Sequence, residues 1–387
     1  HTGPNLAPLG DGSFEIVNIS WGDTFLGASL QGDVRLTASS LDVYNVTGDV
    51  ASGLFLGQFT FGLRPNSRSW FRIDLQQVEA ARLLGPLPAA AAHVKGLVDM
   101  NLRGNLGRDW DGNGGITLAR GQIYGLEITE WRIPLTFSFS PSQGSGELAI
   151  RNSQARLAQG RACFEGALNW GNGLRLVGLV LFYDVDLGTL LRSVPETSSY
   201  ASGRVSGRID LAGNEMRSLH DLTALVQMKM RQGQVLQMPV LRHITPYLRP
   251  GAASAPFSSG ELKGHLAGGV FRIEHAALVG DFIKLLLLGA INLAGNLNLE
   301  VTAQTGLYCL HPARTSALRS RIPLVGAIPR LVLYEANALL AAAVVHLRIT
   351  GTVRAPVVRL EPLVMLPEEA VRFFLGRAIS LAIPNVP

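Results

Sequence analysis

An alternation of apolar and polar residues over 203–304 is the feature that most limits how this chain can fold. In the run 204–211, Val205, Ile209 and Leu211 stand at alternate positions, and mostly charged or hydroxylated residues stand between them. Successive side chains of a strand point to opposite faces of a sheet, so the pattern predicts a strand with one apolar and one polar face. The run 296–304 repeats this pattern.

The alternation continues through the runs between these two, and glycine or asparagine separates most of them. We therefore predict that the apolar members of the pattern share one face of one sheet. These residues are Val205, Ile209, Leu211, Val226, Met228, Met230, Phe271, Ile273, Ile283, Leu285, Leu287, Ile291, Leu297, Leu299 and Val301.

Composition predicts a mainly β fold for the rest of the chain. The 387 residues include 43 glycines, 47% of them are hydrophobic and only 7% are aromatic. Glycine adopts positive φ without steric conflict, which suits many short strands joined by tight turns. We expect three segments of such strands, 1–88, 89–200 and 201–387, with Gly-Asn pairs marking several of the turns.

Changes of hydrophobic period predict a few short helices. They are expected within 238–248, within 330–345, as single turns at 79–84 and 187–194, and as an amphipathic C-terminal helix at about 367–381. The C-terminal helix is apolar around much of its circumference, so it must dock on the sheet, on a partner or on a membrane surface.

Charge argues against a nucleic-acid partner. The formal net charge is +5 at pH 7, but the arginines are scattered and no basic run contains interleaved aromatic residues. A hydrated polar face accounts for this distribution.

No motif in the sequence indicates catalysis, a cofactor or a metal. The run Asp109–Gly114 matches the first half of an EF-hand loop, but Arg120 stands where a bidentate glutamate is needed, so we predict a turn. Cys163 and Cys309 fit no metal-binding spacing and are either bridged or buried thiols. We therefore predict a protein that is not an enzyme.

A single sheet of this length needs a way to hide its apolar face. Roughly eighteen strands at about 4.8 Å spacing would extend over roughly 85 Å, and open sheets rarely exceed about ten strands without curling or splitting. We expect a long, curled antiparallel sheet that forms an open, taco-like hydrophobic groove. Two sheets paired across a sandwich core are the alternative fold.

Several short patterns between residues 203 and 378 together form the basis for comparison with a known family. They are Gly203-x-Val205-x-Gly207, Gly233-Gln234-Val235 before the helix at 239–248, Phe257 before the strand at Phe271, Gly289-Ala290-Ile291-Asn292-Leu293, 322–326 and 349–356. This set resembles the C-terminal region of the AsmA-like superfamily, which includes the TamB and YhdP groups.

The resemblance implies a periplasmic protein of a bacterial envelope, held by an N-terminal inner-membrane anchor outside this sequence. Its groove would shield acyl chains while phospholipid moves between the inner and outer membranes. Its partners would be phospholipid, both membranes and envelope proteins that dock at the C-terminal helix. The resemblance brings no catalytic residues.

Two other functions fit a β-structured envelope protein. An assembly protein would present sheet edges to outer-membrane proteins as they fold. An extracellular adhesin would have a dry core instead of a lipid-binding face.

Overall fold

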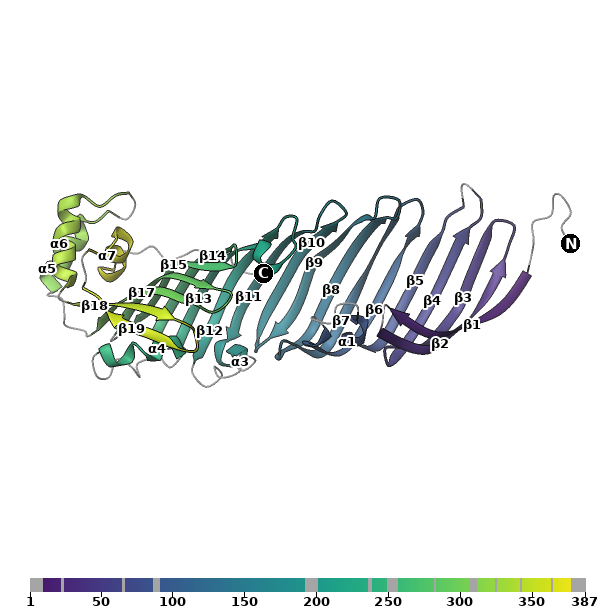
Figure 1. The fold of residues 1–387 in the computed structure, drawn as a ribbon, viewed down its shortest axis with the longest axis horizontal. Coiled ribbons are helices and arrows are strands. Elements are labelled where there is room, and N and C mark those ends of the chain that lie inside the picture. The colour runs from purple at the N-terminus through teal and green to yellow at the C-terminus, as the bar shows by residue number, and fades with distance from the viewer. Residues whose placement is uncertain are drawn as a thin grey trace. The chain divides into compact units, whose positions relative to one another are not determined.

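The computed structural model of the chain is mainly β and describes residues 10–21, 24–64, 67–85, 91–191, 201–235, 239–248, 257–281, 283–305, 312–323, 326–341, 343–362 and 365–376. Its nineteen strands belong to one sheet, and the pairings are antiparallel (Figure 1). The chain divides into two compact units, unit 1 with residues 1–180 and 212–217 and unit 2 with residues 181–211 and 218–387. The prediction of a long antiparallel sheet is confirmed.

Unit 1 is a meander in which each strand from β1 to β9 pairs with the next one along the chain. Its elements are β1 (Gly10–Trp21), β2 (Thr24–Leu36), β3 (Ser40–Val50), β4 (Gly53–Gly62), β5 (Trp70–Glu79), α1 (Ala80–Leu83), β6 (Val94–Leu106), β7 (Trp110–Ile123), β8 (Leu126–Ser140), β9 (Ser145–Leu157) and β10 (Gly160–Trp170). β11 (Arg175–Asp186) and β12 (Ser202–Gly213) have residues in both units.

Unit 2 continues the meander from β13 to β19 and contains most of the helices. Its further elements are α3 (Leu187–Leu191), η1 (Leu219–Asp221), β13 (Leu222–Gln234), α4 (Pro239–Arg242), η2 (Thr245–Tyr247), β14 (Phe257–Ala267), β15 (Val270–Gly280), β16 (Ile283–Asn292), β17 (Leu297–Thr305), α5 (Pro312–Arg321), α6 (Arg330–Ala341), β18 (Val344–Gly351), β19 (Pro356–Leu360) and α7 (Glu368–Phe374).

The expected helices are present, with changed limits. The helix predicted within 238–248 is two short pieces, α4 and η2, and the helix within 330–345 is α6. The C-terminal helix begins where expected but is described only as α7, and the end of its predicted range lies outside the described residues. α5 was not predicted.

The prediction of short strands is wrong. Strands such as β7 and β8 contain 14 and 15 residues. Gly104–Asn105 and Asp111–Gly114, which we expected at turns, lie inside β6 and β7, and the chain bends at 107–109 instead. Gly104 and Gly112 lie in strand interiors, where the rings of Phe71 and Phe137 pack over them.

One register row crosses unit 1 from β2 to β10 on the apolar face. Its members, directly paired from strand to strand, are Val34, Val43, Phe59, Phe71, Gly104, Gly112, Phe137, Leu148 and Leu168. The adjacent row, which points to the other face, contains Gln58, Arg72, Arg103, Asn113 and Thr136. The two-faced sheet expected from the alternation therefore extends through unit 1.

Two rings meet above the glycines of this row. Phe71 of β5 and Phe137 of β8 are three strand spacings apart, about 14 Å measured across the strands. Their ring centroids are nevertheless 6.1 Å apart, because Gly104 and Gly112 between them have no side chains. A Cβ at Gly112 would lie 2.5 Å from Cζ of Phe137.

Bulges recur in unit 1 and carry polar residues in the left-handed region. Asn45 of β3 has φ 53°, and the β3–β4 register shifts between Val43 and Val46. Gln77 of β5 and Glu130 of β8 have φ 55° and 51° at similar shifts. A bulge bends its strand and increases the local right-handed twist, so these positions curve the sheet.

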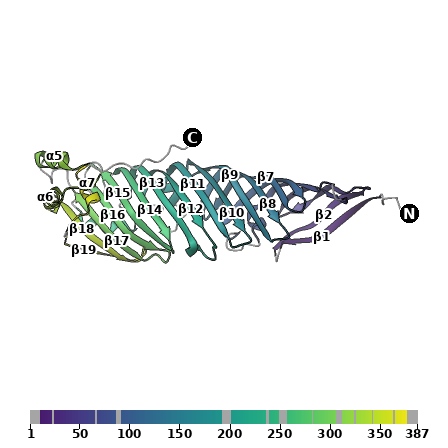
Figure 2. The same ribbon diagram turned by 90° about the horizontal axis from the view of Figure 1, so that it is seen from above.

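In unit 2, helices cover the face of β15 and β16 opposite the predicted apolar residues. Ala277 of β15 and Leu286 of β16 are paired across the strands and are buried together with Val332 of α6 and Phe374 of α7. α5, α6 and α7 lie together at this end of the sheet in both views (Figures 1 and 2). The uninterrupted apolar run 285–288 follows from burial on both faces.

Polar contacts hold α7 in place at both ends. Ile328 N donates to Glu368 Oε2 (3.0 Å) beside the start of the helix. At its end, Lys284 Nζ donates to the Phe374 carbonyl (3.4 Å) and Arg319 donates to the Gly376 carbonyl (2.8 Å). Cations at a helix C-terminus satisfy its free carbonyls and interact favourably with the helix dipole.

We predict that Gly112→Val destabilises the protein by about 1–3 kcal/mol, because the new side chain overlaps the Arg103 carbonyl oxygen and the Phe137 ring. The measurement is the free energy of unfolding from urea titration. Gly12→Val is the matched control, because a Cβ at Gly12 has no heavy atom within 4 Å. Equal losses of stability in the two variants would show that the Phe137 ring does not need a glycine at position 112 in order to pack.

We predict a pH-dependent contribution from Lys284. Burial, and then the nearby Arg319 charge, lower its pKa from the ordinary value of 10.5. The unfolded chain therefore binds more protons between the lowered pKa and 10.5, and stability from this group rises with pH through that window. The free energy of unfolding of wild type relative to Lys284→Met should therefore rise with pH across that window. A parallel pH profile in both proteins would contradict this.

Candidate apolar binding face

A cavity of about 280 Å³ opens on the apolar face of unit 2. Seven of the residues predicted from the sequence line it, namely Val205, Met228, Met230, Ile273, Leu285, Leu287 and Val301. The rest of the lining consists of Gly260, the ion-paired Lys229 and Glu261, and six further apolar residues, namely Leu187, Val235, Leu241, Leu262, Ala276 and Leu278. The cavity can therefore exclude water from an apolar ligand but offers few side-chain polar groups to orient one.

Strand register explains why these side chains converge. One row runs from Met228 through Leu262, Ala276 and Leu287 to Val301, with each residue paired to the next. The row beside it runs through Val226, Gly264, Ile273, Gly289 and Leu299. Phe271, Ile291 and Leu297 form a third row on the same face.

The predicted residues differ in how much of each remains accessible. Ile283, Leu285, Leu297, Leu299 and Val301 are at most 5% exposed and pack as in a protein core. Val205, Met230 and Ile273 are nearly as buried, with 7–9% exposure. The half-buried members are Ile209, Leu211, Val226, Met228, Phe271, Leu287 and Ile291, so the accessible part of the face lies on β12 to β16.

Two short helices contribute lining residues that strand alternation could not identify. Leu187 belongs to α3 and Leu241 to α4, and both line the cavity. The helix at 239–242 was expected from the change of period after Pro239, whereas Leu241 was not among the predicted lining residues. Side chains from helices reach the sheet only through tertiary packing, which has no period in the sequence.

The apolar face of unit 1 is also partly uncovered. Phe55, Phe59, Ile73, Leu102 and Phe137 point to this face and are half-buried, whereas a sandwich core would bury them. Near α1 the face is closed instead, because Leu75, Val78, Val98 and Leu118 form a buried cluster with Leu26. Unit 1 therefore has an accessible apolar row beside a small core.

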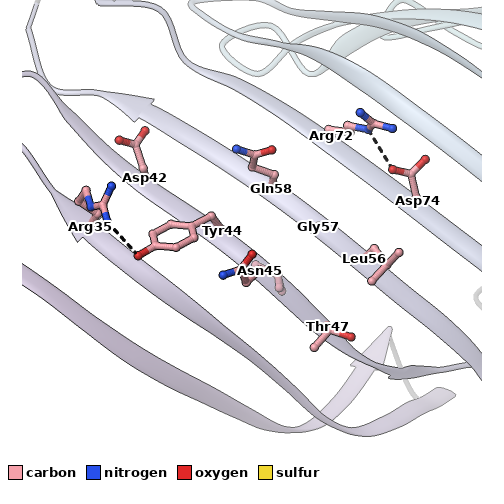
Figure 3. A pocket seen from close by; sticks show the side chains of 11 residues that line it. Arg35, Asp42, Tyr44, Asn45, Thr47, Leu56, Gly57, Gln58, Arg72 and Asp74 are labelled. Atoms are coloured by element: carbon pink, nitrogen blue, oxygen red, sulfur yellow. Dashed lines mark hydrogen bonds and ion pairs between the residues drawn. The ribbon is translucent and has the colours of Figure 1, made fainter.

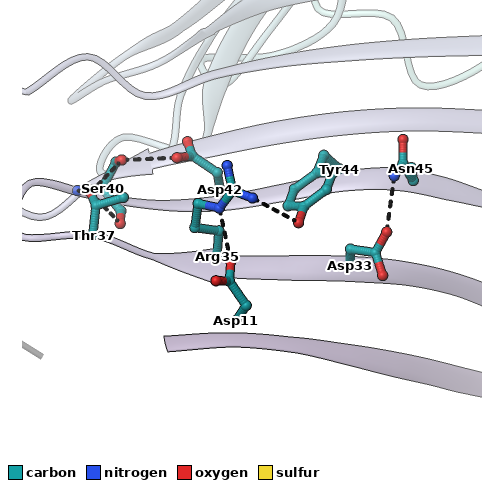
Figure 4. Close-up of polar contacts among 8 residues, drawn as sticks. All are labelled: Asp11, Asp33, Arg35, Thr37, Ser40, Asp42, Tyr44 and Asn45. Atoms are coloured by element: carbon teal, nitrogen blue, oxygen red, sulfur yellow. Dashed lines mark hydrogen bonds and ion pairs between the residues drawn. The ribbon is translucent and has the colours of Figure 1, made fainter. Parts of the chain in front are cut away.

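A polar recess of about 790 Å³ lies on the other face of β2 to β5 (Figure 3). Its charged groups are held by hydrogen bonds, some to an opposite charge and some to a neutral side chain. Arg35 Nε donates to Asp11 Oδ1 (2.8 Å), Arg72 Nε donates to Asp74 Oδ2 (3.0 Å), and Asn45 Nδ2 donates to Asp33 Oδ2 (2.9 Å), as Figure 4 shows for the first and last of these. The hydrogen bond from Arg35 to Asp11 is the main cause that raises the pKa of Arg35. Exposed pairs of this kind are typical of a hydrated sheet face.

The structure also describes most of the remaining residues that were considered for metal binding or thiol chemistry. Asp109 stands at the bend before β7 and accepts a hydrogen bond from Ser140 Oγ (2.6 Å). The described residues contain no group of three or more metal-ligating side chains. Cys163 is a free, half-buried thiol, and Cys309 lies outside the described residues.

Comparison of the chain with protein-family models, with curated proteins and with solved structures gives no match. The resemblance to the AsmA-like superfamily therefore stays a prediction. Within the described part of the chain, no helix is long and apolar enough to cross a membrane.

We predict that Ala276→Trp fills the cavity and lowers the fluorescence of bound anilinonaphthalene sulfonate several-fold, because an indole takes most of the space that an apolar dye would occupy. Leu225→Trp is the control, since Leu225 is 56% exposed and outside the cavity lining. Equal dye binding by both variants would show that the dye does not use the cavity.

Proposed function

We propose that the protein binds phospholipid acyl chains on its apolar face and conducts them between the inner and outer membranes of a bacterial envelope. The observation that carries the proposal is the apolar cavity of unit 2, which continues into half-buried side chains on β12 to β16. Each methylene transferred from water to such a surface is worth about 0.8 kcal/mol. The AsmA-like resemblance supports a periplasmic location and an inner-membrane anchor outside this sequence.

The character of the lining fits movement better than tight recognition. Met228 and Met230 are flexible, polarisable side chains that adapt to irregular ligands. The lining lacks a convergent set of polar groups, so an acyl chain would have no fixed register along it. Headgroups would stay in water at the open side of the face.

We predict that a photo-crosslinking amino acid at Val226 or Met228 captures phospholipid in cells, because both positions are half-buried on the apolar face. The same group at Gln227, between them, points to the other face and should capture none. Mass spectrometry of the crosslinked protein identifies the lipid. Capture at Gln227 alone would overturn the assignment of the face.

Native mass spectrometry of the purified protein separates this proposal from the two alternatives. Co-purified phospholipid supports transport. A protein free of lipid that crosslinks to unfolded outer-membrane proteins supports assembly through a sheet edge. A protein that shows neither lipid nor such crosslinks supports an adhesin.

A further inference from the structure

The outer face of α6 exposes an apolar stripe. Leu331 and Tyr334 are 66% and 71% exposed, and the exposed Ala338 and Ala341 continue the same side of the helix. The opposite side is packed into the helical core, where Ala336 and Leu340 are fully buried. α6 is therefore apolar on both sides, and only one side has a partner among the described residues.

An exposed cation flanks this stripe on one side and an ion pair on the other. Arg330 is exposed and lies one turn from Tyr334, at a spacing of four residues. On the other side, Arg321 of α5 pairs with Glu335 (2.7 Å), which lies one turn from Leu331. Together α5 and α6 carry four arginines and one glutamate.

We infer that the α6 stripe docks on the surface of a membrane that contains anionic phospholipid. Leucine and tyrosine would enter the boundary between headgroups and acyl chains, where a ring with a polar end is favoured. Arg330 would contact the anionic headgroups, and the excess of arginine over glutamate on α5 and α6 would attract them. A second copy of the chain is a poorer occupant, because stripe against stripe would bring the arginines of both copies together.

The docking surface is separate from the apolar cavity. Leu331 and Tyr334 belong to the helical layer on one face of β16, and the cavity opens on the other face of that strand. The inference takes its membrane context from the proposed function but depends on different residues. If lipid co-purifies and membranes do not bind, only this inference fails; if membranes bind and no lipid is captured, only the proposed function fails.

The test is sedimentation of the protein with vesicles. Wild type should bind vesicles of phosphatidylcholine mixed with phosphatidylglycerol, and bind pure phosphatidylcholine several-fold less. Raising the salt from about 0.1 M to about 1 M should weaken binding, because the Debye length falls from about 10 Å to about 3 Å. The double variant Leu331→Glu, Tyr334→Glu should bind the mixed vesicles at least about tenfold less, because it removes the apolar contact and adds repulsion.

The control is Leu225→Glu with Leu293→Glu, which adds the same charge at two exposed leucines of unit 2. This variant should keep most of the binding. Equal losses in both double variants, equal binding to both kinds of vesicle, or no binding by wild type would overturn the inference. A wild-type dimer that the α6 variant abolishes, without vesicle binding, would assign the stripe to self-association instead.

Discussion

The contact of Phe71 with Phe137 above Gly104 and Gly112 shows the constraint on which the apolar face of unit 1 depends. A long strand whose apolar face has no second sheet must cover its backbone with its own side chains. Aromatic rings that pack over neighbouring glycines cover the backbone and project little from the sheet. The result is a continuous apolar surface on which Phe71 is buried and Phe59 and Phe137 stay half-buried.

Unit 2 repeats this device with other partners. Gly264 lies beside Phe271, with a built Cβ 2.7 Å from Cζ, and Gly207 lies beside Phe182 at 2.5 Å. A glycine in a strand usually destabilises it, because glycine gives the unfolded chain more conformational entropy to lose and has no side chain to pack. Here the ring restores the packing, so the glycines allow long strands instead of ending them. This explains why glycine content alone predicted turns at positions that are strand interiors.

The alternation predicted correctly which face of the sheet each residue lies on, but it did not predict how deeply each residue is buried. The predicted residues of β13 to β17 share one face because a period of two fixes the face of every residue once the register is set. Burial is different, because it depends on what packs from outside the strand. Nothing around Leu299 or Val301 distinguishes them from Met228, yet the first two are at most 2% exposed and the last is half-buried. α3 and α4 contribute Leu187 and Leu241 for the same reason, and α5 was missed because its amphipathic pattern is weak.

Under the proposed function, the two units would give an acyl chain different surroundings. In unit 1 the lining is a row of rings and glycines, which is shallow and stiff, so a chain would contact it from one side only. In unit 2, Met228, Met230 and Leu241 surround a cavity, so a chain would contact protein on several sides and lose more water-exposed area. Residence should therefore be longer in unit 2. Beyond the cavity, Leu299, Leu347 and Ile349 are at most 2% exposed and close the face as a dry core, so an acyl chain bound in the cavity would find no room past them.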